Sequence, residues 1–176
     1  MAPHTGRYTN DATADRGRTP AQWYCLLAGL ALLLAGLFGF LADAGFAVGD
    51  VPSGTVDGDL FLGFEVNGWH NLVHVASGLV LLAAANTRPS AKAVALGFGL
   101  VYGLVAIIGL VDGSDVLGII PVNGADNILH VALALLGILT GLVSKARRTP
   151  RGAVHDPALD RGTAGEPIPN ATRAPH

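Results

Sequence analysis

Hydrophobic residues are concentrated in four blocks along this chain, and the segments between the blocks are polar and rich in glycine and proline. The blocks cover residues 23–42, 69–85, 93–111 and 128–143, the last with a polar lead-in from residue 124. With its flanks, each block reaches roughly 18 to 21 residues, which at about 1.5 Å per residue crosses a hydrocarbon core of about 30 Å. The pattern predicts four transmembrane helices, at about residues 23–42, 68–86, 93–111 and 124–143.

The blocks lack the charged stripe that helices of a soluble bundle carry at a period of about 3.6 residues. Residues 23–42 contain no ionisable group except Cys25, and residues 93–111 contain none except Tyr102. All ten prolines lie outside the blocks, as expected because a helix interior tolerates proline poorly. Hydrophobic residues make up 51% of the chain and charged residues only 14%, which also favours a membrane protein. We therefore predict an all-α polytopic membrane protein whose main partner is the lipid bilayer.

The basic residues predict the orientation of these helices, because Lys and Arg are retained on the cytoplasmic side. All eleven lie before the first block, between the second and third, or after the fourth: Arg7, Arg16, Arg18, Arg88, Lys92, Lys145, Arg147, Arg148, Arg151, Arg161 and Arg173. The other two loops carry only acids in or beside them: Asp43, Asp50, Asp57, Asp59, Glu65, Asp112, Asp115 and Asp126. We expect a multi-pass protein of the cell membrane with both the N- and the C-terminus in the cytoplasm.

Composition divides the chain into a membrane domain and two polar ends. Residues 1–21 and 146–176 are rich in Pro, Gly, Ala, Thr and charge and show no apolar periodicity, so they cannot build a core of their own. We expect both ends to be disordered in the cytoplasm, flanking a four-helix transmembrane domain at residues 22–145.

An internal repeat links the second and fourth blocks. Residues 66–76 align without gaps to residues 122–132, and seven of the eleven positions are identical. Each copy leads from a loop into a helix and follows an apolar helix that ends in Asp, at Asp43 and Asp112. The repeat predicts two duplicated helical hairpins of the same topology, related by a pseudo-two-fold axis along the membrane normal.

The repeated segment also carries a motif that resembles a known family. Asn71, His74 and Gly78 form an Asn-x-x-His-x-x-x-Gly run, and the last helix opens with Asp-Asn-x-Leu-His at residues 126–130. Over about residues 22–145 the chain resembles the actinobacterial membrane family known as domain of unknown function 4383. The resemblance implies an integral membrane protein with four helices and implies no activity. The chain departs from the pattern at Trp69, where a proline is expected, and at Ala134, which stands where Gly78 stands in the first copy.

Small residues predict where helices approach closely in lipid, where side-chain burial gives little driving force. Gly99 and Gly103 form one GxxxG pair, and Gly137 and Gly141 form another. We expect both pairs to lie at helix contacts.

Polar residues of the repeat are expected at the outer end of the two even-numbered helices. Asn67 and Asn123 are natural N-caps, because their side-chain oxygens can accept from free amides of the first turn. Asn71 and His74 follow Asn67 on the same helix face, at steps of four and three, and the second copy repeats this with Asn127 and His130. Polar side chains at that depth in a membrane need partners.

Three interpretations of this cluster stay open. In the first, Asn71, His74, Asn127 and His130 are structural and hydrogen-bond across the pseudo-two-fold axis. In the second, the outer ends of the two helices hold zinc, iron, copper or haem, with His70, His74, Asp126 and His130 as ligands, because residues four apart share a helix face. In the third, the same groups form a proton or solute path of a small transporter, although no acid or base lies deeper in the helices.

The sequence carries no sign of an enzyme or of a nucleic-acid binding protein. It has no phosphate-binding loop of the P-loop type, no Gly-x-Ser-x-Gly and no dinucleotide-binding glycine motif after a strand. We expect a non-enzymatic membrane protein, for which a homo-oligomer or another membrane protein stays open as a further partner.

Overall fold

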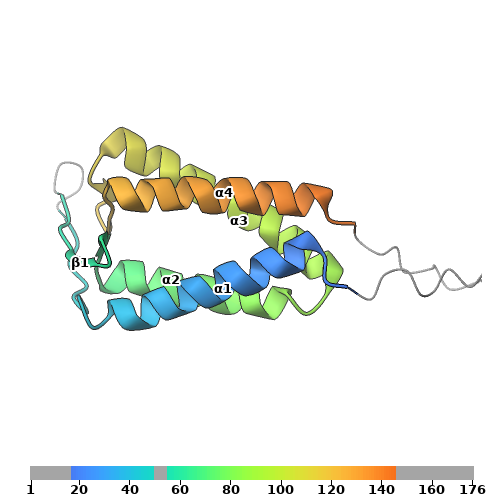
Figure 1. The fold of residues 1–176 in the computed structure, drawn as a ribbon. Coiled ribbons are helices and arrows are strands. Elements are labelled where there is room, and N and C mark those ends of the chain that lie inside the picture. The colour runs from blue at the N-terminus through green and yellow to red at the C-terminus, as the bar shows by residue number, and fades with distance from the viewer. Residues whose placement is uncertain (1–16, 50–54, 146–176) are drawn as a thin grey trace, which may run out of the picture.

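A computed structural model describes residues 17–49 and 55–145, which form four helices and two small β-hairpins, one hairpin between the first two helices and one between the last two (Figure 1). The elements are α1 (Pro20–Gly39), β1 (Asp59–Phe61), β2 (Phe64–Val66), α2 (Gly68–Ala84), α3 (Arg88–Asp112), β3 (Asp115–Val116), β4 (Ile120–Pro121) and α4 (Gly124–Val143). The predicted four helices are confirmed. The expected disorder of the two ends concerns mostly residues 1–16 and 146–176, which lie outside the described residues.

Two helices begin earlier than the hydrophobic pattern predicts, because their caps lie outside the apolar blocks. Thr19 and the side chain of Gln22 form a capping box that starts α1 at Pro20. Thr87 accepts from the Ser90 amide and starts α3 at Arg88. In both helices a proline occupies one of the first two positions, where its missing amide hydrogen is no loss.

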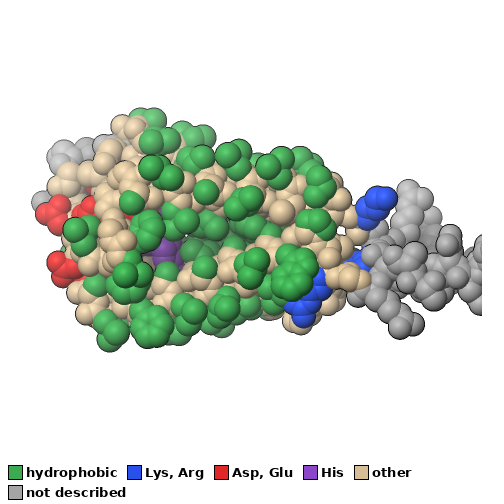
Figure 2. All heavy atoms as spheres, viewed as in Figure 1, with side chains coloured by type: hydrophobic (Ala, Val, Ile, Leu, Met, Phe, Trp, Pro, Cys, Tyr) green, Lys and Arg blue, Asp and Glu red, His purple; other side chains and the backbone are tan. Residues whose placement is uncertain are grey.

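Three of the helices are long and apolar enough to cross a membrane: Pro20–Gly39, Arg88–Val111 and Gly124–Val143. The fourth, α2, is apolar but has only 17 residues. Large hydrophobic side chains face outward on all four helices, and they cover the length of the bundle in Figure 2. Lys and Arg gather at one end of this view and Asp and Glu at the other. We call these the basic end (Arg18, Arg88, Lys92 and Lys145) and the acidic end (Asp43, Asp57, Asp59, Glu65, Asp115 and Asp126).

The helices pack as two pairs, α1 with α2 and α3 with α4. Each pair is brought together by a glycine of its first helix. A Cβ on Gly29 would lie 3.1 Å from the Gly78 carbonyl oxygen, and one on Gly99 would lie 2.8 Å from the Ala134 carbonyl oxygen. The second pair therefore has a close helix contact like that of the first pair, although Ala134 stands in place of a glycine. Gly99 on α3 makes this contact possible.

The two pairs meet most closely at the basic end. There a core of small side chains, Ala21, Cys25, Ala28, Ala84, Ala85, Ala91 and Ala95, is almost fully buried. Two hydrogen bonds also connect helix ends here. The Gln22 side chain donates to the Ala85 carbonyl at 2.9 Å, and the Ala21 amide donates to Ser144 Oγ at 2.9 Å. Helix α3 begins beside the α1–α2 pair at this end and crosses obliquely toward the outer side of α4 (Figure 1).

The β-hairpins lie in the acidic loops and were not expected for an all-α protein. β1 pairs with β2 through Phe61 and Phe64, and the turn between them has positive φ at Leu62 (54°) and Gly63 (92°). β3 pairs with β4, and its turn has positive φ at Leu117 (60°) and Gly118 (67°). Leucine is rare at the first position of such turns, which usually carries Asn or Gly, so the hairpins were not recognised from the sequence.

Candidate metal centre

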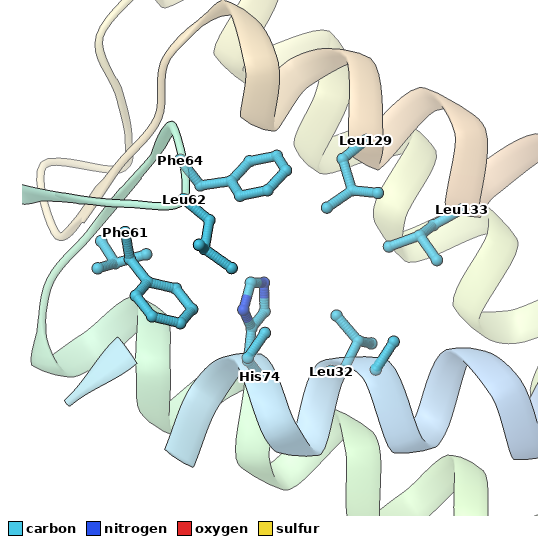
Figure 3. Close-up of a pocket in the computed structure, with 10 residues that line it drawn as sticks. Leu32, Phe61, Leu62, Phe64, His74, Leu129 and Leu133 are labelled. Atoms are coloured by element: carbon cyan, nitrogen blue, oxygen red, sulfur yellow. The ribbon is translucent and has the colours of Figure 1, made fainter. Parts of the chain in front are cut away.

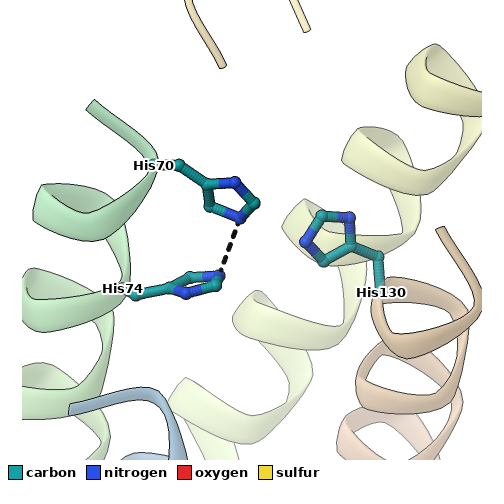
Figure 4. Close-up of side chains that lie close together, drawn as sticks. All are labelled: His70, His74 and His130. Atoms are coloured by element: carbon teal, nitrogen blue, oxygen red, sulfur yellow. Dashed lines mark hydrogen bonds between the residues drawn. The ribbon is translucent and has the colours of Figure 1, made fainter. Parts of the chain in front are cut away.

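Three histidines meet between the helix pairs near the acidic end (Figure 4). His70 and His74 lie on successive turns of α2, and His130 lies on α4. Their exposed fractions are 2%, 6% and 2%. Each offers one nitrogen such that all three nitrogens lie within 4.8 Å of one another. Three of the four predicted ligands are therefore brought together.

His70 and His74 are in direct contact. The two Nε2 atoms are 3.1 Å apart, and His70 Nδ1 is 2.9 Å from the Glu65 carbonyl oxygen. A carbonyl oxygen can only accept, so a hydrogen on His70 Nδ1 would donate to Glu65, and in the neutral ring this tautomer would leave the Nε2 lone pair facing His74. The two Nε2 atoms can share the proton of His74 or bind one cation. A backbone carbonyl that fixes the tautomer in this way is a common partner of a metal-binding histidine.

His130 faces the other two histidines from α4. Its ring centroid lies 6.0 Å from that of His70 and 5.5 Å from that of Tyr102. Within the described residues its Nδ1 is buried and has no hydrogen-bond partner. A buried nitrogen without a partner is costly, so this atom calls for a ligand or a water.

Asp126, the fourth predicted ligand, is buried but points to backbone amides instead of joining the histidines. Its Oδ2 accepts from the Glu65 amide at 2.9 Å and from the Asn123 amide at 3.0 Å, the second bond belonging to the capping box of α4. Its negative charge is close enough to act on His70. Asp126 thus supports the cluster through Glu65.

The predicted N-caps are confirmed, and they also join the two helix pairs. Asn67 accepts from the His70 amide and Asn123 from the Asp126 amide, at 2.9 and 3.1 Å. The Asn67 side chain donates to the Ile119 carbonyl at 2.8 Å, and the Asn123 side chain donates to the Gly63 carbonyl at 3.0 Å. Each cap therefore binds the loop of the opposite pair.

The remaining asparagines of the motif serve contacts within each pair. Asn71 donates to the Asp43 carbonyl at 2.8 Å. A Cβ on Gly39 would collide with Asn71 Oδ1, and one on Gly109 would collide with Asn127 Oδ1, so a glycine Cα hydrogen faces each amide oxygen. Among the described residues no hydrogen bond across the pairs joins Asn71, His74, Asn127 and His130, and the bonds expected from them are made by the caps instead.

Two cavities adjoin the histidines. A cavity of about 110 Å³ is lined by all three histidines, with Ser77 and Tyr102 also in its wall. A larger and almost wholly apolar cavity of about 260 Å³ lies on the other side of His74, which points into it among leucine and phenylalanine side chains (Figure 3). His74 thus separates the two spaces.

Sequence reasoning did not assign two groups that shape this centre. The Glu65 backbone, which contacts both His70 and Asp126, carries no sequence signal. Tyr102, whose ring packs on His130, is the only ionisable group in its apolar block, and that isolation was a usable signal.

Comparison with known proteins supports the resemblance inferred from the repeated motif. No curated protein and no solved structure matches the chain. Residues 22–143, which include the three histidines and all of the four helices except the first two residues of α1, match the family described as Domain of unknown function (DUF4383), and the chain belongs to this family.

Proposed function

We propose that this is a four-crossing protein of the cell membrane, made of two duplicated hairpins, which binds one first-row transition metal ion on His70, His74 and His130 and has no catalytic activity of its own. The observation that carries the proposal is the convergence of three buried imidazoles from two helix pairs, in which the buried His130 Nδ1 has no hydrogen-bond partner among the described residues.

The fourth crossing, by α2, is supported by its packing on α1. Near the acidic end Gly39 faces Asn71, and at the basic end Gln22 bonds the Ala85 carbonyl, so the two helices cover the same depth. The 17 residues of α2 extend about 25 Å, close to a hydrocarbon core of about 30 Å. This contact with α1 at both ends supports a crossing by α2 beside it.

The duplication is supported by matching contacts in the two pairs. Gly39 opposes Asn71 as Gly109 opposes Asn127, and each N-cap asparagine binds the loop of the other pair. These pairs of equivalent contacts fit a pseudo-two-fold axis between the hairpins.

The orientation rests on the basic and acidic ends and is tested with a topology reporter. A reporter that works only outside the cytoplasm should be active when inserted after Ser114 and inactive when fused after His176. An active fusion at His176 would refute the orientation or the number of crossings.

The chemistry of the centre suits zinc, copper or iron. Neutral imidazoles are good ligands for all three, and three protein ligands leave a position open for water or another ligand. Two nitrogens on one tetrahedral zinc at 2.0–2.1 Å are about 3.3 Å apart. The His70–His74 separation of 3.1 Å already fits, and His130 would close from at most 4.8 Å. A single ion fits better than haem, because His70 and His74 touch and leave no room for a flat ring between them.

Metal analysis of the full chain, purified in detergent without chelators, tests the proposal. We expect about one zinc, copper or iron per chain in the wild type. His74→Ala and His130→Leu should lose that metal, whereas Tyr102→Phe, which changes a neighbour of His130 that is not a ligand, should keep it. Wild-type protein that carries no metal and whose Tm ignores added zinc, copper and iron would refute the metal centre.

A further inference from the structure

A groove runs between α1 and α4 along most of the bundle, on the face shown in Figure 2. It consists of two cavities, of about 500 Å³ at the basic end and about 260 Å³ at the acidic end. Ala31 and Leu133 line both cavities, so the two spaces adjoin. Cavities of this size hold organic ligands in other proteins.

The groove exists because α1 presents small residues where α4 presents leucines. Ala28, Ala31 and Ala35 follow one face of α1, and Leu129, Leu133 and Leu136 form the opposite wall. The hydrogen bond from Tyr24 to the Leu133 carbonyl, at 3.0 Å, links these two helices at the floor of the groove. The lining is mostly apolar, so a polar ligand would find few partners along it.

The groove is somewhat longer than one leaflet of a bilayer is thick. Twelve residues separate Trp23 at the basic end from Ala35 at the acidic end, which is about 18 Å of helix at about 1.5 Å per residue. Half of a hydrocarbon core is about 15 Å thick.

The side chain of Arg18 lies at the basic end of the groove. Trp23 lines the groove, and the Arg18 guanidinium lies 5.7 Å from the centre of its ring. Tryptophan and arginine together are typical of the level of lipid headgroups, where Arg binds phosphate.

We propose that this groove binds one acyl chain of an anionic phospholipid from the leaflet at the basic end, with the lipid phosphate at Arg18. The chain runs past Ala31 and ends among Phe61, Leu62 and Phe64, beside His74. The lipid closes the gap that the divergence of the two helix pairs leaves open. This site does not depend on the metal centre, because only His74 borders both.

Retention of lipid by the full chain tests the proposal. Native mass spectrometry of detergent-purified protein should show about one anionic phospholipid per chain, because Arg18 provides one site for a lipid phosphate. Ala31→Phe, which fills the junction of the two cavities, should lose this lipid. Leu104→Phe, on an outward face of α3, is the matched control and should keep it. Equal retention by both variants would overturn the proposal, as would a sterol, a quinone or another partner in place of the phospholipid.

A second measurement guards against a variant that does not fold. In a Trp69→Phe background, Trp23 is the sole tryptophan, and phospholipid with brominated acyl chains should quench its fluorescence. Anionic brominated lipid should quench at lower mole fraction than zwitterionic lipid, and Arg18→Gln should remove this difference. A difference that persists in Arg18→Gln would overturn the headgroup assignment, and absence of quenching would overturn the chain assignment.

Discussion

Replacing His130 by leucine separates a metal centre from a purely structural cluster. His130 is 2% exposed and its Nδ1 has no partner among the described residues. An unsatisfied buried polar atom costs about 1–3 kcal/mol, so in metal-free protein His130→Leu should be as stable as the wild type or more stable by on the order of 1 kcal/mol. A bound ion reverses this order, because ligand at about 100 times its Kd stabilises the folded state by about 2.7 kcal/mol.

The assay is thermal unfolding in detergent, with chelator and then with zinc, for the wild type and His130→Leu. We expect the variant to unfold at an equal or higher Tm in chelator and the wild type to unfold at a higher Tm in zinc. Tyr102→Phe should follow the wild type in both conditions. A variant that is less stable than the wild type in chelator, together with a wild type that does not respond to zinc, would show that His130 serves packing alone.

Three further predictions concern the backbone contacts, all measured as changes in free energy of unfolding in detergent. Gly39→Ala and Gly109→Ala should each destabilise by about 1–3 kcal/mol, since the new methyl group collides with the asparagine opposite, and unchanged stability would contradict the matching contacts. Gly137→Leu should be strongly destabilising, because a Cβ on Gly137 would lie 2.8 Å from the Ala95 carbonyl oxygen. Gly103→Ala should be tolerated, because the nearest atom to a Cβ on Gly103 would be Ala134 Cβ at 3.7 Å, and equal losses of stability in the two variants would refute this distinction. Leu117→Asn should stabilise by up to about 1 kcal/mol, as φ is 60° there, and a loss of stability would mean that the leucine makes a needed contact.

The sequence predicts the helices and their caps well because both depend on local patterns. Four long apolar blocks without charge favour helices, and Asn67 and Asn123 stand where an N-cap is needed. The helix starts at Pro20 and Arg88 were missed, since a hydrophobic pattern does not register a cap in a polar segment.

Glycine pairs illustrate the limit of a motif. The GxxxG pattern treats Gly99 and Gly103 alike, yet a Cβ on Gly99 would press on α4 and one on Gly103 would not. The crossing angle of α3 and α4 decides which glycine lies at the closest point. That angle follows from packing of the whole bundle, which a short motif does not encode.

The candidate metal centre was also predicted only in part from the sequence. A spacing of four places His70 and His74 on one face, so their meeting was predictable. Whether the fourth residue joins them depends on competition for its oxygens, and Asp126 is held by the Glu65 and Asn123 amides. Free amides at a helix N-terminus attract a carboxylate, and the sequence alone did not rank this role against metal binding.

The difference between the two copies of the repeat makes the proposed metal centre asymmetric. Asp126 occupies in the second copy the place that His70 occupies in the first. Both residues bind the backbone of Glu65, since His70 is bonded to its carbonyl and Asp126 accepts from its amide, each at 2.9 Å. The peptide units of Glu65 therefore connect the carboxyl group to the imidazole. In the proposed centre, histidine in both places would leave no carboxyl group near the ion, whereas Asp126 places one beside the three imidazoles.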